Sequence, residues 1–412
     1  MDQLIKAITE ALDVVEGELL GASTHHGKRV ATLTAAMGRR FGMDTDELTA
    51  LTACALLHDN ALTEYISSED KMENPGNLEG QKSNLYLHCK FGQRNMDTLA
   101  SSFKADIRDL VLYHHENPSG MGPFQKRAGE IPLGAELIQI ADLLDVGSHL
   151  QRIQSEKLDA IHGMITEKRG VIFSGRAAEA MLSVLDEQML QSLRDDRILE
   201  TAETFIPPWT VDVEDQLVLN IGILVTRIID YKSVFTHRHS TQIANKAWFM
   251  ACHYGYGQSL QCEIYLASAL HDIGKLTIPE AILEKPGKLN DEEFRIIKSH
   301  VRATYDFLKD INGFEEICAW ASSHHERLDG KGYPFGKKAR ELDFISRLIG
   351  CIDIYQAVSE ERPYHAARDH KTTIGILHEI AAEGAIDKEI VRDMETALAH
   401  FDAGDLPAPK LG

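Results

Sequence analysis

The sequence predicts an all-α protein built from two tandem helical bundle domains. Apolar residues recur at i, i+3 and i+4 through segments such as 241–254 and 291–310, which is the spacing of an amphipathic helix. The alternation of apolar and polar residues that marks a half-buried strand is scarce. Polar landmarks of the front half also return in the back half at a nearly constant distance, which indicates a duplicated domain.

The duplication is carried by histidine and aspartate residues. Each landmark has a counterpart 210 to 213 positions later: His26 and His239, His58-Asp59 and His271-Asp272, His88 and His300, His114-His115 and His324-His325, Asp142 and Asp353. We therefore expect a first domain over residues 1–200, a linker over 201–218 and a second domain over 219–405. Pro207-Pro208 interrupts helix within that linker.

Composition and charge restrict the partners. The 412 residues are 43% hydrophobic and carry a net charge of −20, as in a soluble globular protein of two or three domains. A strongly acidic chain is a poor partner for a nucleic-acid polymer or an anionic membrane, and we expect neither. A small phosphate-bearing ligand, held by a local cluster of cations or by metal ions, fits the charge better.

Cysteine usage and the chain's start predict a cytoplasmic protein. The six cysteines are scattered without a CxxC pair, so buried reduced thiols are expected rather than disulfides. The first twenty residues lack the layout of a signal peptide. The most apolar later run, from Leu217, is too short to span a bilayer, so no membrane insertion is expected.

In the second copy, five histidines and two aspartates recur on successive helices, and a helical bundle can aim such side chains at one interior point. Imidazole together with carboxylate suits manganese, iron or zinc. Two six-coordinate ions offer roughly 12 positions, and these side chains with a bridging aspartate fill about eight. The remaining positions allow ligand oxygens to bind, which favours a catalytic centre over a closed structural one.

The segments HDIGK, KSH, HHERLDGKGYP and DIYQAVSEERPYH resemble the HD-GYP subgroup of the HD metal-dependent phosphohydrolases. The resemblance implies a phosphodiesterase that hydrolyses cyclic dinucleotides, chiefly cyclic di-GMP, to a linear product. It also implies a two- or three-metal centre of iron or manganese. Carried over by position, the ligands would be His239, His271, Asp272, His300, His324, His325 and Asp353. Members with a third metal have a glutamate where this chain has Phe235, so we expect two divalent ions.

The resemblance also implies roles for other residues. Asp272 would bridge the ions, and Lys275 would stabilise the charge on the reacting phosphate or protonate the leaving 3′ oxygen. Arg362 and His365 would grip the second phosphate of the ligand, while Lys331 and Tyr333 would line the mouth of the site. An ordinary surface turn is the alternative for Lys331 and Tyr333, and a plain surface cation is the alternative for Arg362. Gln356 departs from the aspartate that the family usually has.

The first copy retains counterparts of all seven ligands: His26, His58, Asp59, His88, His114, His115 and Asp142. Leu62, however, stands where the second copy has its lysine, and the tyrosine of GKGYP is missing. A leucine cannot donate a proton. We expect a degenerate domain that can bind metal but catalyses poorly, and that serves stability, dimerisation or ligand sensing. Two active sites are the alternative, and a homodimer is among the assemblies allowed.

The predicted substrate is cyclic di-GMP or 3′,3′-cyclic GMP-AMP, because a degenerate HD domain followed by HD-GYP also resembles phosphodiesterases for the latter. Two other functions stay open. One is a receptor that binds the dinucleotide without hydrolysing it. The other is a general HD phosphohydrolase that acts on nucleotides, which has no need of HHERLDGKGYP.

Overall fold

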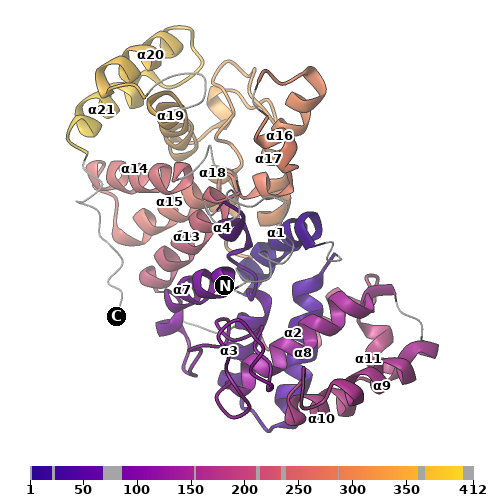
Figure 1. Cartoon of the computed structure of the whole chain (residues 1–412). Coiled ribbons are helices and arrows are strands. Elements are labelled where there is room, and N and C mark those ends of the chain that lie inside the picture. The colour runs from indigo at the N-terminus through magenta and orange to yellow at the C-terminus, as the bar shows by residue number, and fades with distance from the viewer. Residues whose placement is uncertain are drawn as a thin grey trace. The chain divides into compact units, whose positions relative to one another are not determined.

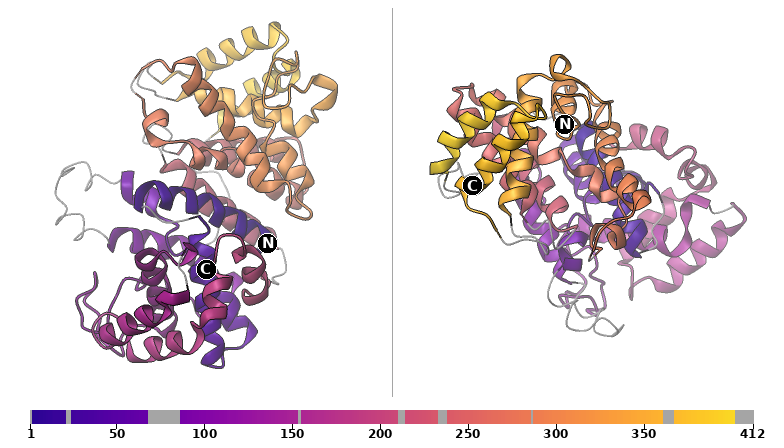
Figure 2. Two further views of the ribbon diagram at one scale, coloured as in Figure 1. Left: turned by 90° about the vertical axis from the view of Figure 1, so that its right-hand side faces the viewer. Right: turned by 90° about the horizontal axis from the view of Figure 1, so that it is seen from above.

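In the computed structural model, the described residues are 2–20, 24–67, 86–152, 155–209, 214–232, 238–285, 287–360 and 367–401. Contacts within the chain divide it into two compact units, Met1–Asp212 and Val213–Gly412. Over the described ranges both units consist of helices and loops without a β-strand (Figures 1 and 2). The predicted all-α class is confirmed.

The first unit contains ten described α-helices and three short 3-10 segments. They are α1 (Asp2–Leu20), α2 (His26–Arg40), α3 (Thr45–Leu56), α4 (Leu62–Ser67), α7 (Tyr86–Asp97), η1 (Ala100–Ser102), α8 (Leu133–Ser148), η2 (Leu150–Arg152), η3 (Ser155–Lys157), α9 (Leu158–Lys168), α10 (Gly175–Val184), α11 (Glu187–Ser192) and α12 (Ile198–Phe205). The second unit repeats the order of the helices that carry the predicted ligands: α2 begins at His26 and α8 carries Asp142, and their counterparts in the second unit begin at His239 and carry Asp353.

The second unit contains, among its described residues, nine α-helices and three 3-10 segments. They are α13 (Asp215–Asp230), α14 (His239–His253), α15 (Gln258–Leu270), η5 (Ile273–Thr277), α16 (Glu280–Leu283), α17 (Asp291–Leu308), α18 (Glu315–Ala321), η6 (Ala339–Glu341), α19 (Phe344–Ser359), α20 (His370–Ala382), α21 (Lys388–Ala397) and η7 (Leu398–His400).

One central helix organises each bundle. In the first unit α2 packs against α3, α8 and α12, and in the second unit α14 packs against α15 and α19. Every residue of α2 from His26 to Gly38 is buried, as expected of a helix covered on all sides. The centre of each bundle is therefore where side chains from several helices meet.

Both central helices begin at a histidine, and a carboxylate from the preceding helix holds that end. The residues before them, His25 and Arg238, adopt positive φ and offer no side-chain cap. Instead, Asp230 accepts hydrogen bonds from the backbone N–H groups of Ser240 and Thr241 at 2.7 and 3.1 Å. In the first unit Asp13 accepts from Gly27 at 2.9 Å. These carboxylates satisfy N–H groups that a helix start leaves unpaired.

The helix that carries His300 has a start that the sequence explains. Asn290 caps α17 by accepting from Glu293 N–H, and Glu293 in turn accepts from Asn290 N–H. This reciprocal pair and the acidic residues of the first turn favour a helix start at that position. None of the described helices combines the length and apolar character needed to cross a membrane.

Candidate metal centres

The structure brings the seven predicted ligands of the second unit together at the middle of its bundle. His239 is the first residue of α14, His271 and Asp272 directly follow α15, His300 lies in α17, His324 and His325 follow α18, and Asp353 lies in α19. Three sets of three have donor atoms within 4.8 Å of one another, and one of them, His271, Asp272 and His324, shares a residue with each of the other two. Of those two, one comprises His239, His271 and Asp353, and the other comprises His300, His324 and His325.

Asp272 lies between the two sets. Its Oδ2 atom is 3.0 Å from Nε2 of His271, and its Oδ1 atom is 3.2 Å from Nε2 of His300. Each carboxylate oxygen thus faces a different set of ligands. This is the position that a bridging carboxylate needs between two cations.

Three of the histidines are oriented by the backbone of their own helices. Nδ1 lies 2.6 to 2.7 Å from the carbonyl oxygen three residues earlier in His271, His300 and His324. A carbonyl oxygen only accepts, so each Nδ1 carries the proton and each Nε2 offers a lone pair. A hydrogen bond from the second ring nitrogen is the usual way in which proteins orient a metal-bound imidazole.

Unsatisfied atoms at the centre test whether these residues fit a cation. Nε2 of His271 and Oδ1 of Asp272 are buried and have no hydrogen-bond partner. A buried polar atom without a partner costs about 1–3 kcal/mol, so most are satisfied in proteins. Both atoms are metal ligands by type and belong to residues whose donor atoms cluster with that of His324, so bound cations would satisfy them. The residues therefore fit a metal centre.

Protonation states are also compatible with metal binding. Burial raises the pKa of Asp272, but His271 and Lys275 outweigh it and hold this pKa well below its usual range. Burial lowers the pKa of His325 to about 4. Burial also holds the pKa of His324 well below its ordinary value. At neutral pH these groups are the carboxylate and the neutral imidazoles that metals bind.

Lys275 and Gly274 shape the segment after His271. Lys275 lies in the 3-10 segment η5, and its ammonium donates to Oδ2 of Asp272. A Cβ atom on Gly274 would lie 1.9 Å from the carbonyl oxygen of His300. Only glycine therefore lets η5 approach α17 this closely.

The backbone of the turn that follows the paired histidines is held by the carboxylate of Glu326. Glu326 accepts hydrogen bonds from the backbone N–H groups of Phe335, Gly336 and Lys337 at 2.7 to 3.1 Å. A Cβ atom on Gly332 would lie 2.4 Å from the backbone nitrogen of Arg327, so this position also requires glycine. No pattern in the sequence marked Glu326, which anchors the turn predicted to line the mouth of the site.

Among the predicted substrate-binding residues, Tyr333 lies beside the centre, with its ring centroid 4.9 Å from that of His325. The Lys331 side chain is 80% exposed, and its ammonium lies 3.9 Å from Oδ2 of Asp329. Arg362 and His365 lie outside the described residues, as does Phe235.

Gln356 turns away from the metal ligands. Its amide oxygen accepts from Lys246 at 2.8 Å, and its amide nitrogen donates to Glu360 at 3.2 Å. Glu360 also accepts from Nδ1 of His239 at 2.9 Å. Burial lowers the pKa of His239, but hydrogen bonds to Asp353 and Glu360 outweigh it and raise this pKa to about 9. A cation would therefore have to displace the proton on Nε2.

The first unit repeats this arrangement with the ligands predicted for it. His26, His58 and Asp142 form one set, and His88, Cys89, His114 and His115 form the other. Oδ1 of Asp59 lies 3.4 Å from Nε2 of His88, while its Oδ2 lies 3.7 Å from Nε2 of His58. Nε2 of His58 and Oδ1 of Asp59 lack hydrogen-bond partners, like their counterparts in the second unit. The metal-binding geometry is thus present twice.

Cys89 is a site residue that the sequence reasoning missed, because cysteine was expected only as a buried thiol. It is fully buried in α7. Burial raises the pKa of its thiol, but His114 and His88 outweigh burial and lower this pKa to about 6. The only signal in the sequence is that Cys89 adjoins a predicted ligand, His88.

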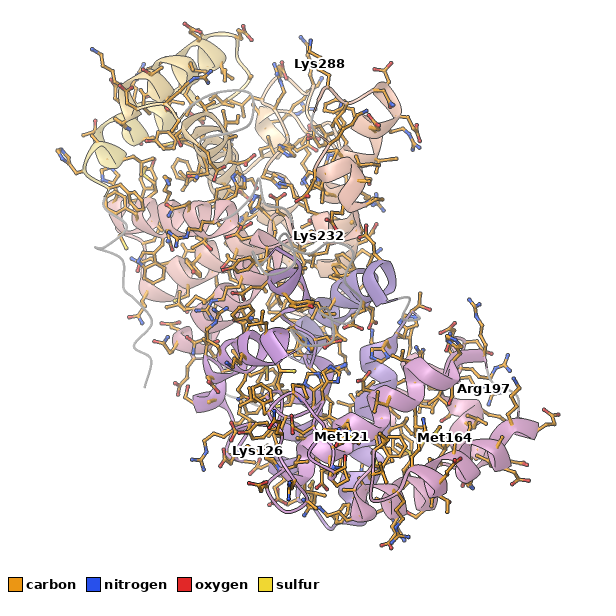
Figure 3. The ribbon with its side chains drawn as sticks, in the orientation of Figure 1. Met121, Lys126, Met164, Arg197, Lys232 and Lys288 are labelled. Atoms are coloured by element: carbon orange, nitrogen blue, oxygen red, sulfur yellow. The ribbon has the colours of Figure 1, made fainter. Side chains whose placement is uncertain are left out.

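A cavity of about 1160 Å³ opens beside the first centre. His115 contributes to its wall together with Lys157, Lys168, Met121 and Met164, and the two methionines are labelled in Figure 3. The cavity therefore connects a member of the centre with solvent and is large enough for a small molecule.

Comparison with known proteins identifies the family. Two family models, both described as HD domain, match the chain. One matches residues 24–147 and the other matches residues 224–390. Each match falls within one unit and spans its candidate centre. The HD resemblance seen in the sequence is thereby confirmed for both halves.

Curated relatives share much of the chain. The 3′3′-cGAMP-specific phosphodiesterase 1 of Vibrio cholerae is 28% identical over 403 residues, which cover 94% of this chain and 89% of that protein. The 3′3′-cGAMP-specific phosphodiesterase 3 of the same organism is 30% identical over 69% of this chain and 61% of its own. A cyclic di-GMP phosphodiesterase of Thermotoga maritima is 36% identical over 42% of this chain and 47% of its own.

One solved structure matches the whole chain. It is the crystal structure of a cyclic GMP-AMP-specific phosphodiesterase of V. cholerae (V-cGAP3), with a TM-score of 0.64 and coverage of 98% of both chains. The sequences are 23% identical, so the likeness shows that the two chains share a fold.

Proposed function

The chain belongs to the HD domain family and carries two HD domains in tandem, and from this premise we propose that it is a phosphodiesterase that hydrolyses a cyclic dinucleotide to its linear form. The observation that carries the proposal is Asp272, whose two oxygens face two separate sets of ligands while Lys275 contacts it. A phosphodiester needs both features, because charge develops on its oxygens and on the leaving group.

Two divalent ions, iron or manganese, are proposed for the second unit. His239, His271 and Asp353 would hold one ion, His300, His324 and His325 would hold the other, and Asp272 would contact both. Bound there, such ions supply positive charge that polarises a phosphoryl oxygen. The neutral imidazoles of His324 and His325 and the ionised carboxylate of Asp272 are donors that these metals prefer, whereas His239 would release a proton on binding.

Residues of the chain itself would orient the substrate and move a proton. The Lys275 ammonium, which contacts Asp272, can pass a proton to the 3′ oxygen as its bond to phosphorus breaks. Tyr333 packs beside His325 and would narrow the approach to the centre from the side of the turn. Glu326 would keep this turn in place through its three hydrogen bonds. Arg362 and His365 stay predicted holders of the second phosphate.

The preferred substrate within this class is 3′,3′-cyclic GMP-AMP. The relative that matches 94% of the chain, both units included, is named as specific for it, whereas the cyclic di-GMP phosphodiesterase of T. maritima matches 42%. The first unit, with Leu62 in place of the lysine, is proposed to be a poor catalyst.

The test is chromatography of digests of both cyclic dinucleotides by the metal-loaded protein and its His271→Ala/Asp272→Ala variant. We expect linear product from the wild type, more from cyclic GMP-AMP than from cyclic di-GMP, and none from the variant. His378→Ala is the matched control, because this histidine pairs with Glu395 on the surface of the same unit. A metal-loaded wild type that leaves both dinucleotides intact would refute the proposal, and equal activity in the double variant would refute the assigned centre.

A further inference from the structure

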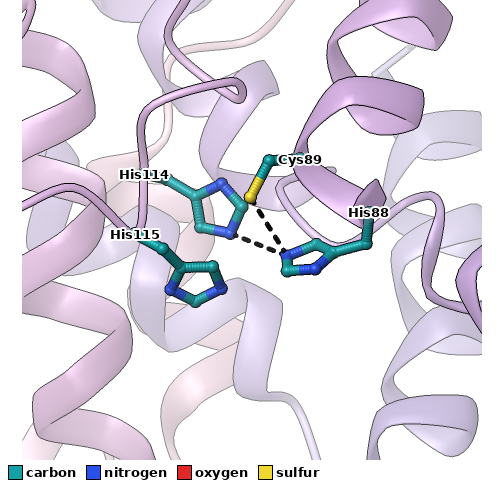
Figure 4. Close-up of side chains that lie close together, drawn as sticks. All are labelled: His88, Cys89, His114 and His115. Carbon is teal, nitrogen blue, oxygen red and sulfur yellow. Dashed lines mark hydrogen bonds between the residues drawn. The ribbon is translucent and has the colours of Figure 1, made fainter. Parts of the chain in front are cut away.

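Cys89 adds a sulfur to a set of three histidines in the first unit. Its Sγ atom lies 3.6 Å from Nε2 of His88, and the same Nε2 lies 3.4 Å from Nε2 of His114. Each of these residues and His115 offers a donor atom within 4.8 Å of the others. Figure 4 shows the thiol and the three rings converging from α7 and from the loop that carries the paired histidines.

These separations can be compared with those of a bound ion. Zinc bonds of about 2.0–2.1 Å to nitrogen and 2.3 Å to sulfur give tetrahedral edges of about 3.3–3.4 Å between nitrogens and 3.5–3.6 Å between nitrogen and sulfur. The two measured distances, 3.4 and 3.6 Å, agree with these edges. Both separations from Nε2 of His88 are thus those of atoms that share one ion, and the third pair lies within the 4.8 Å common to the cluster.

The sulfur distinguishes the first unit from the second. Position 301, which corresponds to Cys89, is a buried valine next to His300. The remaining histidines are matched, since Nε2 of His300 also lies 3.4 Å from Nε2 of His324. The two centres thus share an imidazole frame, and only the first contains a thiol. Thiolate ligands favour zinc over manganese and other ions that prefer oxygen.

We propose that the first unit binds a zinc-class divalent ion through His88, His114, His115 and the thiolate of Cys89, whereas the second unit holds its ions with nitrogen and oxygen alone. The thiol proton passes to solvent when the ion binds. His115 lines the cavity described above, which gives the ion a path from solvent. The two halves of one chain would thereby select different metals.

Cobalt(II) loading of the full-length protein provides the test, because a thiolate bound to cobalt absorbs in the near ultraviolet and histidine or carboxylate ligands do not. We expect this charge-transfer absorption in the wild type, its loss in Cys89→Ser and its retention in Cys252→Ser. Cys252 is the matched control, since it is the exposed one of the six free cysteines and the natural place for adventitious cobalt. An absorption that survives in Cys89→Ser, or disappears in Cys252→Ser, overturns the proposal.

X-ray absorption on zinc-loaded protein covers the case in which Cys89→Ser fails to fold. The full-length His271→Ala/Asp272→Ala variant is used, because it removes two ligands of the second centre and keeps the first intact. We expect one sulfur neighbour at about 2.3 Å from zinc. A shell of nitrogen and oxygen only would contradict the assignment. Neither readout depends on hydrolysis of a dinucleotide, so the result is separate from the function proposed above.

Discussion

Glu360 holds His239 in the second unit as Asp145 holds His26 in the first. Oε2 of Glu360 lies 2.9 Å from Nδ1 of His239, and Oδ2 of Asp145 lies 2.7 Å from Nδ1 of His26. The two carboxylates do not occupy equivalent positions, because the counterpart of Asp145 is Gln356. A carboxylate one helical turn later has taken over the contact that the substitution removed.

Glu360→Ala should weaken metal binding by the second centre. Loss of the carboxylate that orients a metal-bound imidazole typically lowers metal affinity by about 10–100-fold. Competition with a chelating dye would measure the change, with Glu379→Ala on the exposed face of α20 as the matched control. Adding Gln356→Asp to Glu360→Ala should restore affinity by reproducing the arrangement of the first unit. Unchanged affinity in Glu360→Ala would show that the contact does not position His239.

Lys275→Leu introduces into the second unit the residue that the first unit has at position 62. We expect kcat on the cyclic dinucleotide to fall by about 10²–10⁴-fold, the usual contribution of a positioned general acid. Metal content should stay at the wild-type value, because the ligands are unchanged. Steady-state kinetics together with metal analysis would check both, and Lys371→Leu on the surface of α20 is the control. A wild-type kcat in Lys275→Leu would exclude the proton-transfer role.

Gly274→Ala should destabilise the second unit. The added Cβ would meet the carbonyl oxygen of His300 at 1.9 Å and the backbone nitrogen of Thr304 at 2.8 Å, and neither backbone atom can move independently. Overpacking of this kind costs about 1–3 kcal/mol or more. Gly375→Ala is the matched control, since Gly375 lies in α20 with no atom within 4 Å of its added Cβ. Alanine should raise stability there by about 0.5–1 kcal/mol. Thermal unfolding that ranks the two variants equally would contradict this account.

Lys246 should make stability depend on pH in the alkaline range. Burial lowers the pKa of Lys246 from 10.5 to about 8. Between these two values the unfolded chain binds more protons than the folded one, so the free energy of unfolding should rise as pH rises. The rise should be on the order of 3 kcal/mol in total, from the pKa difference. It should fade out as pH falls well below 8, where both states are protonated.

Urea unfolding from pH 7 to pH 10 would reveal this effect as a difference between the wild type and Lys246→Met. The variant has no group to titrate, so its stability should not share the rise. Lys371→Met, at an exposed position, is the control that should follow the wild type. If the free energy of unfolding changed with pH in the same way in the wild type and in Lys246→Met, the pKa of Lys246 would not be lowered by folding.

The sequence allowed the candidate metal ligands to be grouped because they repeat. His239 and Asp353 lie far apart in the chain, yet the spacing of their counterparts His26 and Asp142 marked them as parts of one set. Their Nε2 and Oδ1 atoms lie 3.4 Å apart in the structure. The fold class followed from helical periodicity alone.

Other parts of the site depend on geometry that no pattern reveals. Glu360 contacts His239, whereas Gln356 bonds Lys246 and Glu360 instead. These contacts depend on side-chain rotamers and packing, which the sequence does not reveal. Glu326 follows the paired histidines directly, but its bonds reach backbone groups nine to eleven residues away. The close approach at Gly274 is made by a 3-10 segment, which also carries Lys275 and has no marked signal in the sequence.

The bonds from ring nitrogens to carbonyl oxygens link ion occupancy to the integrity of the helix ends. His271 and His324 each donate to a carbonyl in the last turn of α15 or α18, so they complete those turns while their other nitrogens face the centre. Fraying of either end would swing an imidazole away, and an ion held by it would resist that fraying. With such an ion bound, occupancy and local folding would be one equilibrium at these positions, and a chelator would act as a local denaturant there.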